Sequence, residues 1–381
     1  MQKSKEFSRD ELYKAYFDCV KNKKNTPAAL KFEFQLEKNL SQLYLDIIHN
    51  NYKVGKSSCI VVNRASCPRE IWTGTFRDKI IHHLIRNRLI DRYYNKFISN
   101  VFNGIPKRGV LLGAMTAKCY AEDVTEQYAK KAYYLKCDIS NFFNSIDKDI
   151  LFNIIKRELS DESEKWLLNI IEKIIYNNPT KNIAYIPPEK IRTKVPIEKR
   201  LHYKTSKKGL PIGNLASQFF SNIYMNELDQ FVVNELNVIR YCRYADDMIF
   251  FDEDVKFLNY VYEQISQFLL NELELKLNPK KKCINLIEKG FDFIGYVIKP
   301  NRILLRAKTI KKSFYQVRKW HSMPNKFSQI ELEKLRSRTN GYLGLANKTN
   351  NFNYRKKLSE EVSGNLFIKP DKDYKKIIKL I

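Results

Sequence analysis

Arg243-Tyr244-Ala245-Asp246-Asp247-Met248 is an acidic step inside an apolar run that extends from Val238 to Phe251. An apolar run of this length with a short polar break predicts two strands joined by a tight turn. An ionised carboxylate pair between apolar strands is costly unless a cation neutralises it. The stretch therefore predicts a β-hairpin whose tip carries metal-binding carboxylates.

Two further segments carry related chemistry. Ala132 to Cys137 is predicted to be a buried strand that ends at Asp138, and Gly209 to Gly213 forms a turn before a predicted helix. Carboxylates at a strand end and on a hairpin tip can hold two Mg²⁺ ions roughly 3.5 to 4 Å apart, as phosphoryl transfer from a nucleoside triphosphate requires. Small residues in the turn permit close backbone approach to a nucleotide or template. A plain strand-to-helix turn is the competing interpretation.

The composition indicates a compact globular protein with a polyanionic partner. Of 381 residues, 44% are hydrophobic, and Gly and Pro, at 12 each, are too few for a fibrous or linker-rich chain. Lysine and arginine number 68 against 42 aspartates and glutamates, a formal charge of +26. Nucleic acid is favoured over a membrane as partner, because no apolar run approaches spanning length. Residues 301–381 hold 20 basic and six acidic residues, which suits a terminal lobe that grips phosphates.

The cysteines and the N-terminus indicate a reducing compartment. Seven scattered cysteines without a Cys-x-x-Cys pair, and only five histidines, predict neither a disulfide framework nor a zinc site. Met1 to Glu11 lacks the apolar stretch of a secretion signal. A cytoplasmic protein is expected.

The apolar spacing predicts a mixed α/β chain. Helices are predicted within Ser8–Tyr52, Phe76–Phe97, Ile150–Ile175, Leu215–Phe231 and Lys256–Leu275, and from Lys311 onward with breaks at Pro324, Gly341–Asn350 and Pro370. Strands are predicted at Ser57–Asn63, Ala132–Cys137 and Phe291–Ile298 and on both sides of the acidic turn. The basic, proline-containing segment from Asn177 to Lys208 is predicted to be a loop-rich insertion, either a contact surface for RNA or protein or simply a solvated loop.

Six segments, taken in order, resemble the reverse transcriptase family. Similar to the family's motifs are Arg77-Asp78-Lys79-Ile80-Ile81, Gly104 to Gly113, the segment that starts at Asp138, Gly209 to Gln218, Tyr244-Ala245-Asp246-Asp247, and Leu277 to Lys282 followed by Gly290 to Tyr296. The shared order is the specific part of the resemblance.

The resemblance implies a role for each matching position. Asp138 and Asp246 would ligate two Mg²⁺ ions, with Mn²⁺ able to substitute, together with the backbone carbonyl of Ile139. Asp247 would support them. The expected nucleotide or template pocket contains Lys107, Arg108, Phe143, Gly213 and Gln218. Phe143 occupies the place of the aromatic residue that excludes the ribose 2′-hydroxyl, although the neighbouring Phe142 could exchange roles with it.

One departure from the common pattern points to a branch of the family. Most members have Gln after the Pro of the middle motif, whereas this chain has Ile212, and Ile212 to Gln218 resembles the run of diversity-generating retroelement reverse transcriptases. Bacterial defence-associated relatives share similar runs. Loss of an amide near the template base predicts lower copying fidelity. A small basic helical accessory protein and a dedicated non-coding RNA are the partners that this branch implies, beside the RNA template, nascent DNA and dNTPs.

The resemblance implies a right-hand α/β (α+β) polymerase in a bacterial or phage-encoded protein. We expect N-terminal helices and fingers over residues 1–131, and a palm of antiparallel strands and helices over 132–300 with the insertion at about 177–208. A basic helical thumb is expected over 301–381. An intron-type maturase, an RNA-templated RNA polymerase and a non-catalytic RNA-binding protein remain the alternatives.

Overall fold

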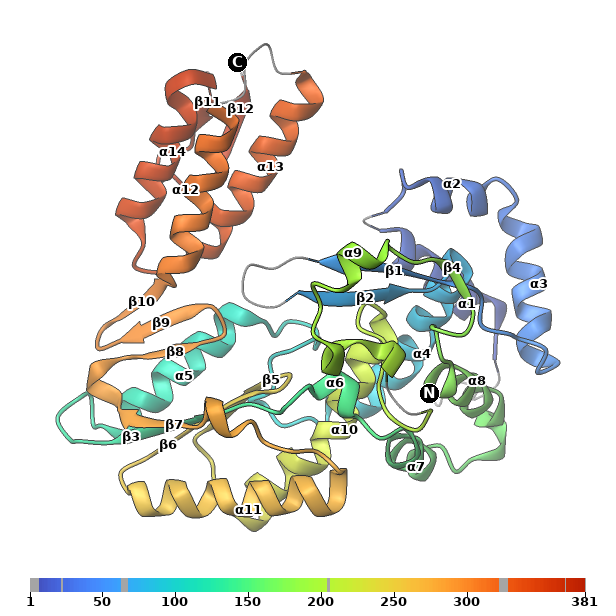
Figure 1. Ribbon diagram of the computed structural model, residues 1–381, viewed down its shortest axis with the longest axis horizontal. Coiled ribbons are helices and arrows are strands. Elements are labelled where there is room, and N and C mark those ends of the chain that lie inside the picture. Colours follow the sequence, from blue (N-terminus) through green and yellow to red (C-terminus); the bar gives the residue numbers. More distant parts are fainter. Residues whose placement is uncertain are drawn as a thin grey trace. The chain divides into compact units, whose positions relative to one another are not determined.

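A computed structural model describes residues 7–21, 23–62, 68–203, 206–321, 328–366 and 368–380 (Figure 1). The chain divides into two compact units, each built from separated segments. The first comprises Met1–Ser99, Ile139–Asn237 and Glu263–Pro279, and the second comprises Asn100–Asp138, Val238–Tyr262 and Lys280–Ile381. These two units differ in kind from the three expected lobes, which are continuous in sequence. The division into lobes at residues 1–131, 132–300 and 301–381 stays a prediction.

Helices at the N-terminus form one side of the first unit. They are α1 (Arg9–Val20), α2 (Pro27–Glu33), α3 (Leu36–Ile48) and α4 (Phe76–Tyr94), and α1 packs along α4. Asp78 closes the first turn of α4. Its fully buried carboxylate accepts hydrogen bonds from the Tyr52 hydroxyl at 2.7 Å and from the backbone amide of Thr75 at 3.0 Å. The helices predicted within Ser8–Tyr52 and Phe76–Phe97 are confirmed.

A three-stranded sheet lies in the same unit, in the order β2-β1-β4. Strands β1 (Ser57–Val62) and β2 (Arg69–Thr73) are antiparallel, and β4 (Ile183–Tyr185) runs parallel to β1. Strand β4 lies within the predicted loop-rich insertion, so that prediction is wrong at these three residues. Ile183 of β4 packs against the hydrophobic cluster around Trp72. A short helix, α9 (Glu189–Arg192), and two 3₁₀ turns follow.

The rest of the first unit is helical. It contains α6 (Phe142–Ser145), α7 (Lys148–Glu158), α8 (Lys165–Tyr176) and α10 (Leu215–Gln230), which continues as a π-helix over Phe231–Glu235. Helix α10 packs against α4 and α7 and is buried along most of its length. Because α10 begins at Leu215, the segment Gly209–Gly213 leads directly into this well-packed helix.

A four-stranded antiparallel sheet organises the second unit, in the order β5-β6-β3-β7. The strands are β3 (Tyr133–Cys137), β5 (Tyr241–Tyr244), β6 (Asp247–Asp252) and β7 (Cys283–Leu286). Helix α5 (Val110–Val124) packs on β5 and β6, and α11 (Val255–Leu273) begins in this unit and ends in the first. The predicted hairpin around the acidic step is confirmed.

The predicted single strand at Phe291–Ile298 is wrong. The segment forms a hairpin of β8 (Phe291–Phe293) and β9 (Tyr296–Lys299), to which β10 (Arg302–Leu305) is added. Both turn residues have positive φ, 39° at Ile294 and 101° at Gly295, a backbone conformation that reverses the chain. The buried Ile294 side chain fits against α5 at Gly113, where a Cβ would lie 2.8 Å from the Ile294 Cδ1.

Three helices and a hairpin complete the second unit: α12 (Ala307–His321), α13 (Gln329–Ala346), α14 (Phe352–Leu366), β11 (Ile368–Pro370) and β12 (Ile377–Leu380). Helix α13 continues through Gly341 to Ala346, so the predicted break begins too early. Glycine costs a helix only about 1 kcal/mol, which burial of Leu343 and Ala346 offsets. The C-terminal hairpin was not predicted, and Pro324 lies outside the described residues.

The six described cysteines are free thiols, and Cys67 lies outside the described residues. Among the described residues, no helix combines the length and apolar character needed to cross a bilayer.

Candidate active site

Strand pairing brings the three candidate catalytic aspartates together. Cys137 on β3 lies opposite Met248 on β6, so the next pair outward is Asp138 and Asp247. Tyr244 on β5 lies opposite Asp247, which leaves Ala245 and Asp246 as a two-residue loop between the strands. The central strands of one sheet therefore deliver all three carboxylates to the same end.

The three aspartates differ in burial, since Asp246 and Asp247 are half-buried and Asp138 is buried. Asp138 is only 5% exposed, and the ammonium of Lys281 lies 2.5 Å from its Oδ2. Burial raises the pKa of Asp138 above its usual range, although Lys281 opposes this rise. Burial, followed by the charges of Asp138 and Asp247, raises the pKa of Asp246 to about 7. The site thus holds more negative charge than its protein surroundings neutralise.

The carboxylates fit a magnesium centre that is completed by other ligands. Among the residues described, no group of three or more His, Cys, Asp or Glu side chains forms a closed metal cage. Mg²⁺ does not need one, since it commonly keeps several waters and takes only one or two carboxylates plus substrate phosphates. The raised pKa of Asp246 indicates that the ionised carboxylate is unfavourable beside the other two aspartates, and the ammonium of Lys281 offsets part of this charge at Asp138. A bound divalent cation would stabilise the ionised carboxylates in the same way.

Ile139, whose carbonyl was expected to be a metal ligand, directly follows Asp138 in the chain. Its backbone forms an antiparallel bridge with Leu277, and the Ser140 amide donates to the Lys276 carbonyl at 2.8 Å. These bonds hold the chain in place just after the first aspartate. Ligation by the Ile139 carbonyl stays a prediction.

Phe143 and Phe142 differ in exposure. Phe142 is 3% exposed and belongs to the core, whereas Phe143 is half-buried, and the two rings meet edge to face with centroids 5.3 Å apart. The preceding Asn141 has a φ of 49°, which turns the chain from β3 into α6. Phe143 is therefore the ring of the pair with a free surface.

Residues Gly209 to Gly213 lie against helix α6 and strand β2. The Leu210 amide donates to the Phe143 carbonyl at 2.7 Å, and the Trp72 amide donates to the Ile212 carbonyl at 2.8 Å. Gly213 has a φ of 121°, and a Cβ there would lie 2.8 Å from the Trp72 carbonyl oxygen. The close approach predicted for this turn is thus made to β2. Ile212 and Gln218 are half-buried.

Lys107 and Arg108 lie in the loop before α5. Lys107 is exposed with a φ of 62°, and one Arg108 guanidinium nitrogen donates to the Val101 carbonyl at 3.2 Å. The structure thus gives Arg108 a part in holding the loop. Contact of either residue with a triphosphate stays a prediction.

Two residues gain importance that the sequence did not assign to them. Lys281 belongs to the run Leu277 to Lys282 that was matched to a family motif, but no role was attached to it. Arg243 precedes the Tyr-Ala-Asp-Asp box and is fully buried. A charged residue inside an apolar strand was the available signal for Arg243, whereas only the fold places Lys281 beside Asp138.

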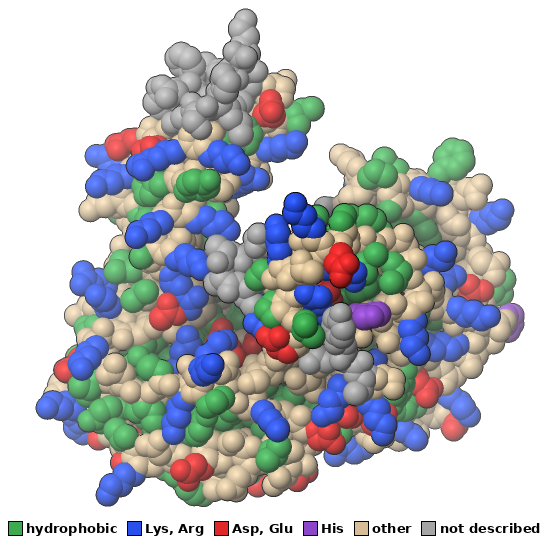
Figure 2. Space-filling model, in the orientation of Figure 1, with side chains coloured by type: hydrophobic (Ala, Val, Ile, Leu, Met, Phe, Trp, Pro, Cys, Tyr) green, Lys and Arg blue, Asp and Glu red, His purple; other side chains and the backbone are tan. Residues whose placement is uncertain are grey.

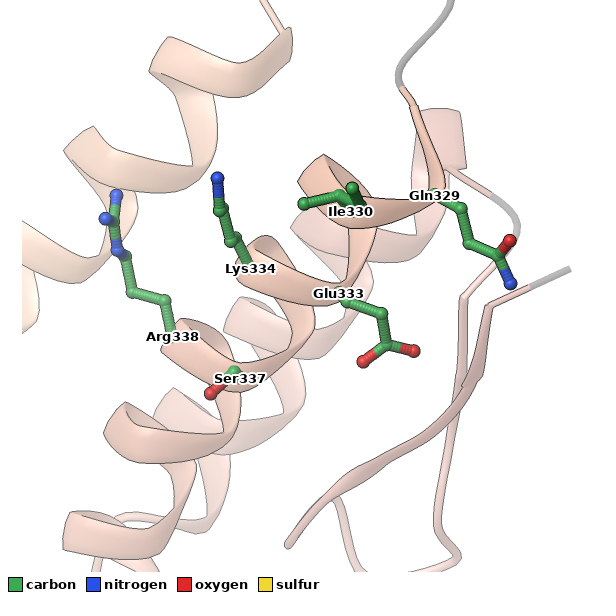
Figure 3. A pocket seen from close by; sticks show the side chains of 6 residues that line it. All are labelled: Gln329, Ile330, Glu333, Lys334, Ser337 and Arg338. Atoms are coloured by element: carbon green, nitrogen blue, oxygen red, sulfur yellow. The ribbon is translucent and has the colours of Figure 1, made fainter. Parts of the chain in front are cut away.

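A groove on the outer face of α13 is a separate feature of the second unit. Figure 3 shows Lys334 and Arg338, one helical turn apart, pointing the same way while Glu333 points away from them. Lys and Arg side chains are also frequent along the surfaces of α12 to α14 (Figure 2). This surface matches the basic excess of residues 301–381.

Comparison with known proteins places most of these motifs in one family. The family model described as reverse transcriptase (RNA-dependent DNA polymerase) matches residues 65–298, which include all three aspartates. The group II intron-encoded protein LtrA of Lactococcus lactis subsp. cremoris is 22% identical over 64% of this chain and 46% of its own length. The Retron Ec83 reverse transcriptase of Escherichia coli is 27% identical over 39% of this chain and 41% of its own.

The chain spans less than half the length of these two relatives. Among solved structures, the apo telomerase of Candida tropicalis is similar in fold, with a TM-score of 0.52 at 12% identity over 82% of this chain and 59% of that one. This likeness concerns the polymerase-like fold alone.

Proposed function

Because this chain belongs to the reverse transcriptase family, we propose that it is an RNA-directed DNA polymerase that copies an RNA template into DNA. The observation that carries the proposal is the meeting of Asp138, Asp246 and Asp247 at one end of the central sheet. Their unneutralised charge suits the divalent metals on which this family depends.

In the proposed reaction, the primer 3′-hydroxyl attacks a deoxynucleoside triphosphate. Asp138 and Asp246 would hold two Mg²⁺ ions with the Ile139 carbonyl, and Asp247 would support them. When bound, such ions activate the attacking hydroxyl and stabilise the leaving oxygens. The Lys281 side chain forms an ion pair with Asp138, in which it offsets negative charge at the site. Lys107 and Arg108 would bind the triphosphate.

Selection of the sugar is proposed for Phe143. Its half-buried ring offers a surface that the core residue Phe142 does not, which supports Phe143 as the residue that excludes a 2′-hydroxyl. Gly213 and Gln218 would complete the pocket for nucleotide and template. The fingers, palm and thumb arrangement is proposed with them, the thumb comprising α12 to α14.

The biological role that we propose is low-fidelity copying in a diversity-generating retroelement. It is supported by Ile212 and the run that follows, since an alkyl side chain cannot make the hydrogen bonds of an amide near the template base. A basic helical accessory protein and a dedicated RNA belong to this proposal. A defence role is the second candidate, because related enzymes share the same run. Intron-type and non-catalytic roles rank below both.

The test is Mg²⁺-dependent incorporation of dNTPs and NTPs on a primed RNA template, with sequencing of the products. We expect DNA synthesis by the wild type and a loss of about a thousandfold in Asp246→Asn, equivalent to several kcal/mol of transition-state stabilisation. Incorporation of NTPs in place of dNTPs would instead identify an RNA-templated RNA polymerase. Equal synthesis by wild type and variant would overturn the assignment of the site.

The same assay tests the fidelity proposal. Ile212→Gln is expected to lower the error rate, whereas Ile239→Gln, which changes an isoleucine that is 73% exposed, serves as the matched control and should not. An unchanged error rate in Ile212→Gln would remove the support for a diversity-generating role and leave the polymerase proposal intact.

A further inference from the structure

The loop that carries Asp246 has a strained residue at its first position. Ala245 has a φ of 58°, in the left-handed region that residues other than glycine rarely adopt. The loop has only two residues, and its second is Asp246. Relaxation of Ala245 toward negative φ would redirect the chain at Asp246. The direction of the carboxylate thus depends on what holds Ala245.

The side chain of Arg243 provides that hold. Its guanidinium donates a hydrogen bond to the Ala245 carbonyl at 3.0 Å, two residues along the chain. Arg243 is fully buried on β5. Burial fixes the long side chain in one geometry and makes the loss of its hydrogen bonds costly.

Arg243 is itself held by a neighbouring segment. Its amide donates to the Asn100 carbonyl at 3.0 Å, and its carbonyl accepts from the Phe102 amide at 3.0 Å. Val101 lies between these partners and accepts from Arg108 at 3.2 Å. A continuous set of hydrogen bonds thus joins the loop before α5 to the turn that bears Asp246.

We infer that Arg243 is a positioning residue for catalysis: by bonding the Ala245 carbonyl it maintains the left-handed turn that aims Asp246 at the metal site. The inference rests on the proposed polymerase function. It is nonetheless separable from that function, because it concerns how the turn is held and not whether Asp246 is needed.

The experiment is a double-mutant cycle in the full chain with Arg243→Met and Ala245→Gly. Glycine adopts positive φ without strain, so the turn of the Ala245→Gly variant should depend less on the arginine. Single-nucleotide incorporation gives the maximal rate and the dNTP dissociation constant separately. The dissociation constant of Mn²⁺, measured by electron paramagnetic resonance, gives a readout that needs no turnover. Arg240→Met is the matched control, because Arg240 lies beside the same strand and pairs with Asp123, away from the turn.

We expect Arg243→Met to lower the maximal rate at least about tenfold and to weaken Mn²⁺ binding severalfold, since small misplacements of reacting groups are costly. The dNTP dissociation constant should stay within about twofold. In the Ala245→Gly background, the further loss caused by Arg243→Met should shrink to about threefold or less. Arg243→Lys, which retains a cationic group that can donate hydrogen bonds, should recover part of the rate.

Equal losses from Arg243→Met in both backgrounds, or no loss in either, would overturn the inference. If circular dichroism shows that Arg243→Met does not fold, the cycle is repeated with Arg243→Lys. An equal loss of rate from Arg243→Lys in the wild-type and Ala245→Gly backgrounds would then overturn the inference. A wild type that makes no DNA, or an Asp246→Asn variant that keeps full activity, would count against the proposed function instead. In that event the Mn²⁺ dissociation constants of the four proteins in the cycle still decide the role of Arg243.

Discussion

At the scale of single residues, the three aspartates are the basis of the proposed chemistry and of an instability of this site. Asp138 has a cationic neighbour in Lys281, whereas the pKa of Asp246 is raised to about 7 by burial and by the other two carboxylates. A charge arrangement that is unfavourable without metal becomes favourable when a divalent cation binds. The folded state without metal should therefore carry a measurable penalty.

That penalty predicts a pH dependence of stability. The pKa of Asp246 rises from 3.8 to about 7 on folding, so the folded state loses stability as pH increases from about 4 through 7. In EDTA between pH 5.5 and 8, the midpoint of thermal unfolding should fall more in the wild type than in Asp246→Asn. Between pH 5.5 and the folded-state pKa of about 7, the titration corresponds to at most about 2 kcal/mol, and a difference of about 1 kcal/mol is expected because Asp246 is partly exposed.

Saturating Mg²⁺ should abolish this difference by raising the wild-type midpoint. The comparison between the two proteins is informative because His82, whose pKa is lowered to about 4 by burial, contributes equally to both. Parallel curves for wild type and Asp246→Asn in EDTA would show that Asp246 has an ordinary affinity for protons.

Phe143 gives a second residue-scale prediction. Phe143→Val should raise the incorporation of NTPs relative to dNTPs by at least about tenfold, because a smaller side chain leaves room for the 2′-hydroxyl. The ratio of maximal rate to dissociation constant for the two nucleotides measures the effect. Phe142→Ala is the control: truncation of a core ring should cost about 3 kcal/mol of stability while the selectivity stays the same. Selectivity that moves with Phe142 would exchange the roles of the two rings.

At the scale of elements, the segment before α10 is fixed by its contact with β2. Trp72 donates to the Ile212 carbonyl, and Gly213 lies so close to β2 that a side chain has no room. The glycine was expected to serve a nucleotide or template. That role stays a prediction, and the close approach of the two backbones is a separate, structural reason for a glycine at this position.

Gly213→Ala is therefore expected to be strongly destabilising. Its Cβ would lie 2.6 Å from the Ile71 Cγ2, and its φ of 121° is unfavourable for alanine, so a loss of about 2 to 4 kcal/mol should follow. Chemical denaturation measures the loss. Gly344→Ala is the matched control, because Gly344 lies within α13 and the added Cβ would have no atom within 4 Å apart from its chain neighbours and the backbone of its own helix. This variant should be stabilised by about 0.5 to 1 kcal/mol. Equal midpoints for both variants would contradict this account.

At the scale of the whole molecule, positive charge is concentrated toward the C-terminus. Residues 301–381 account for a net 14 of the 26 excess positive charges. On α12, Lys308, Lys311 and Lys312 are exposed and form no salt bridge within the described part of the chain. The exposed ring of Tyr315 follows one turn later. Such a face suits the phosphate backbone of a template and primer.

Replacement of these three lysines by alanine should weaken template-primer binding and its salt dependence together. The slope of log affinity against log salt should become shallower by about 0.9 for each phosphate of duplex DNA that the variant no longer binds. Fluorescence anisotropy across a range of KCl concentrations measures the slope. Lys356→Ala, on α14 and paired with Glu360, is the control, and its slope should equal that of the wild type. An unchanged slope in the triple variant would assign nucleic-acid binding to another surface.

Local sequence patterns determined the elements and the family of this protein. The hairpin at the acidic step and the helices of the N-terminal region follow from hydrophobic periodicity and capping, which neighbouring residues set among themselves. The motifs and their order led to the reverse transcriptase family, and the comparison with known proteins confirmed that membership. The roles of the pocket residues rest on resemblance and stay predictions.

Tertiary structure alone decided which distant residues meet. Neither the addition of β4 to the first sheet nor the hairpin at Ile294 could be seen locally, because both depend on packing against residues far along the chain. The ammonium of Lys281 reaches Asp138 from 143 residues away, and the segment beginning at Asn100 braces the turn at Asp246. Sequence determined which carboxylates this protein brings to the sheet, whereas their pKa values and orientation arise from burial and long-range hydrogen bonds that exist only after folding.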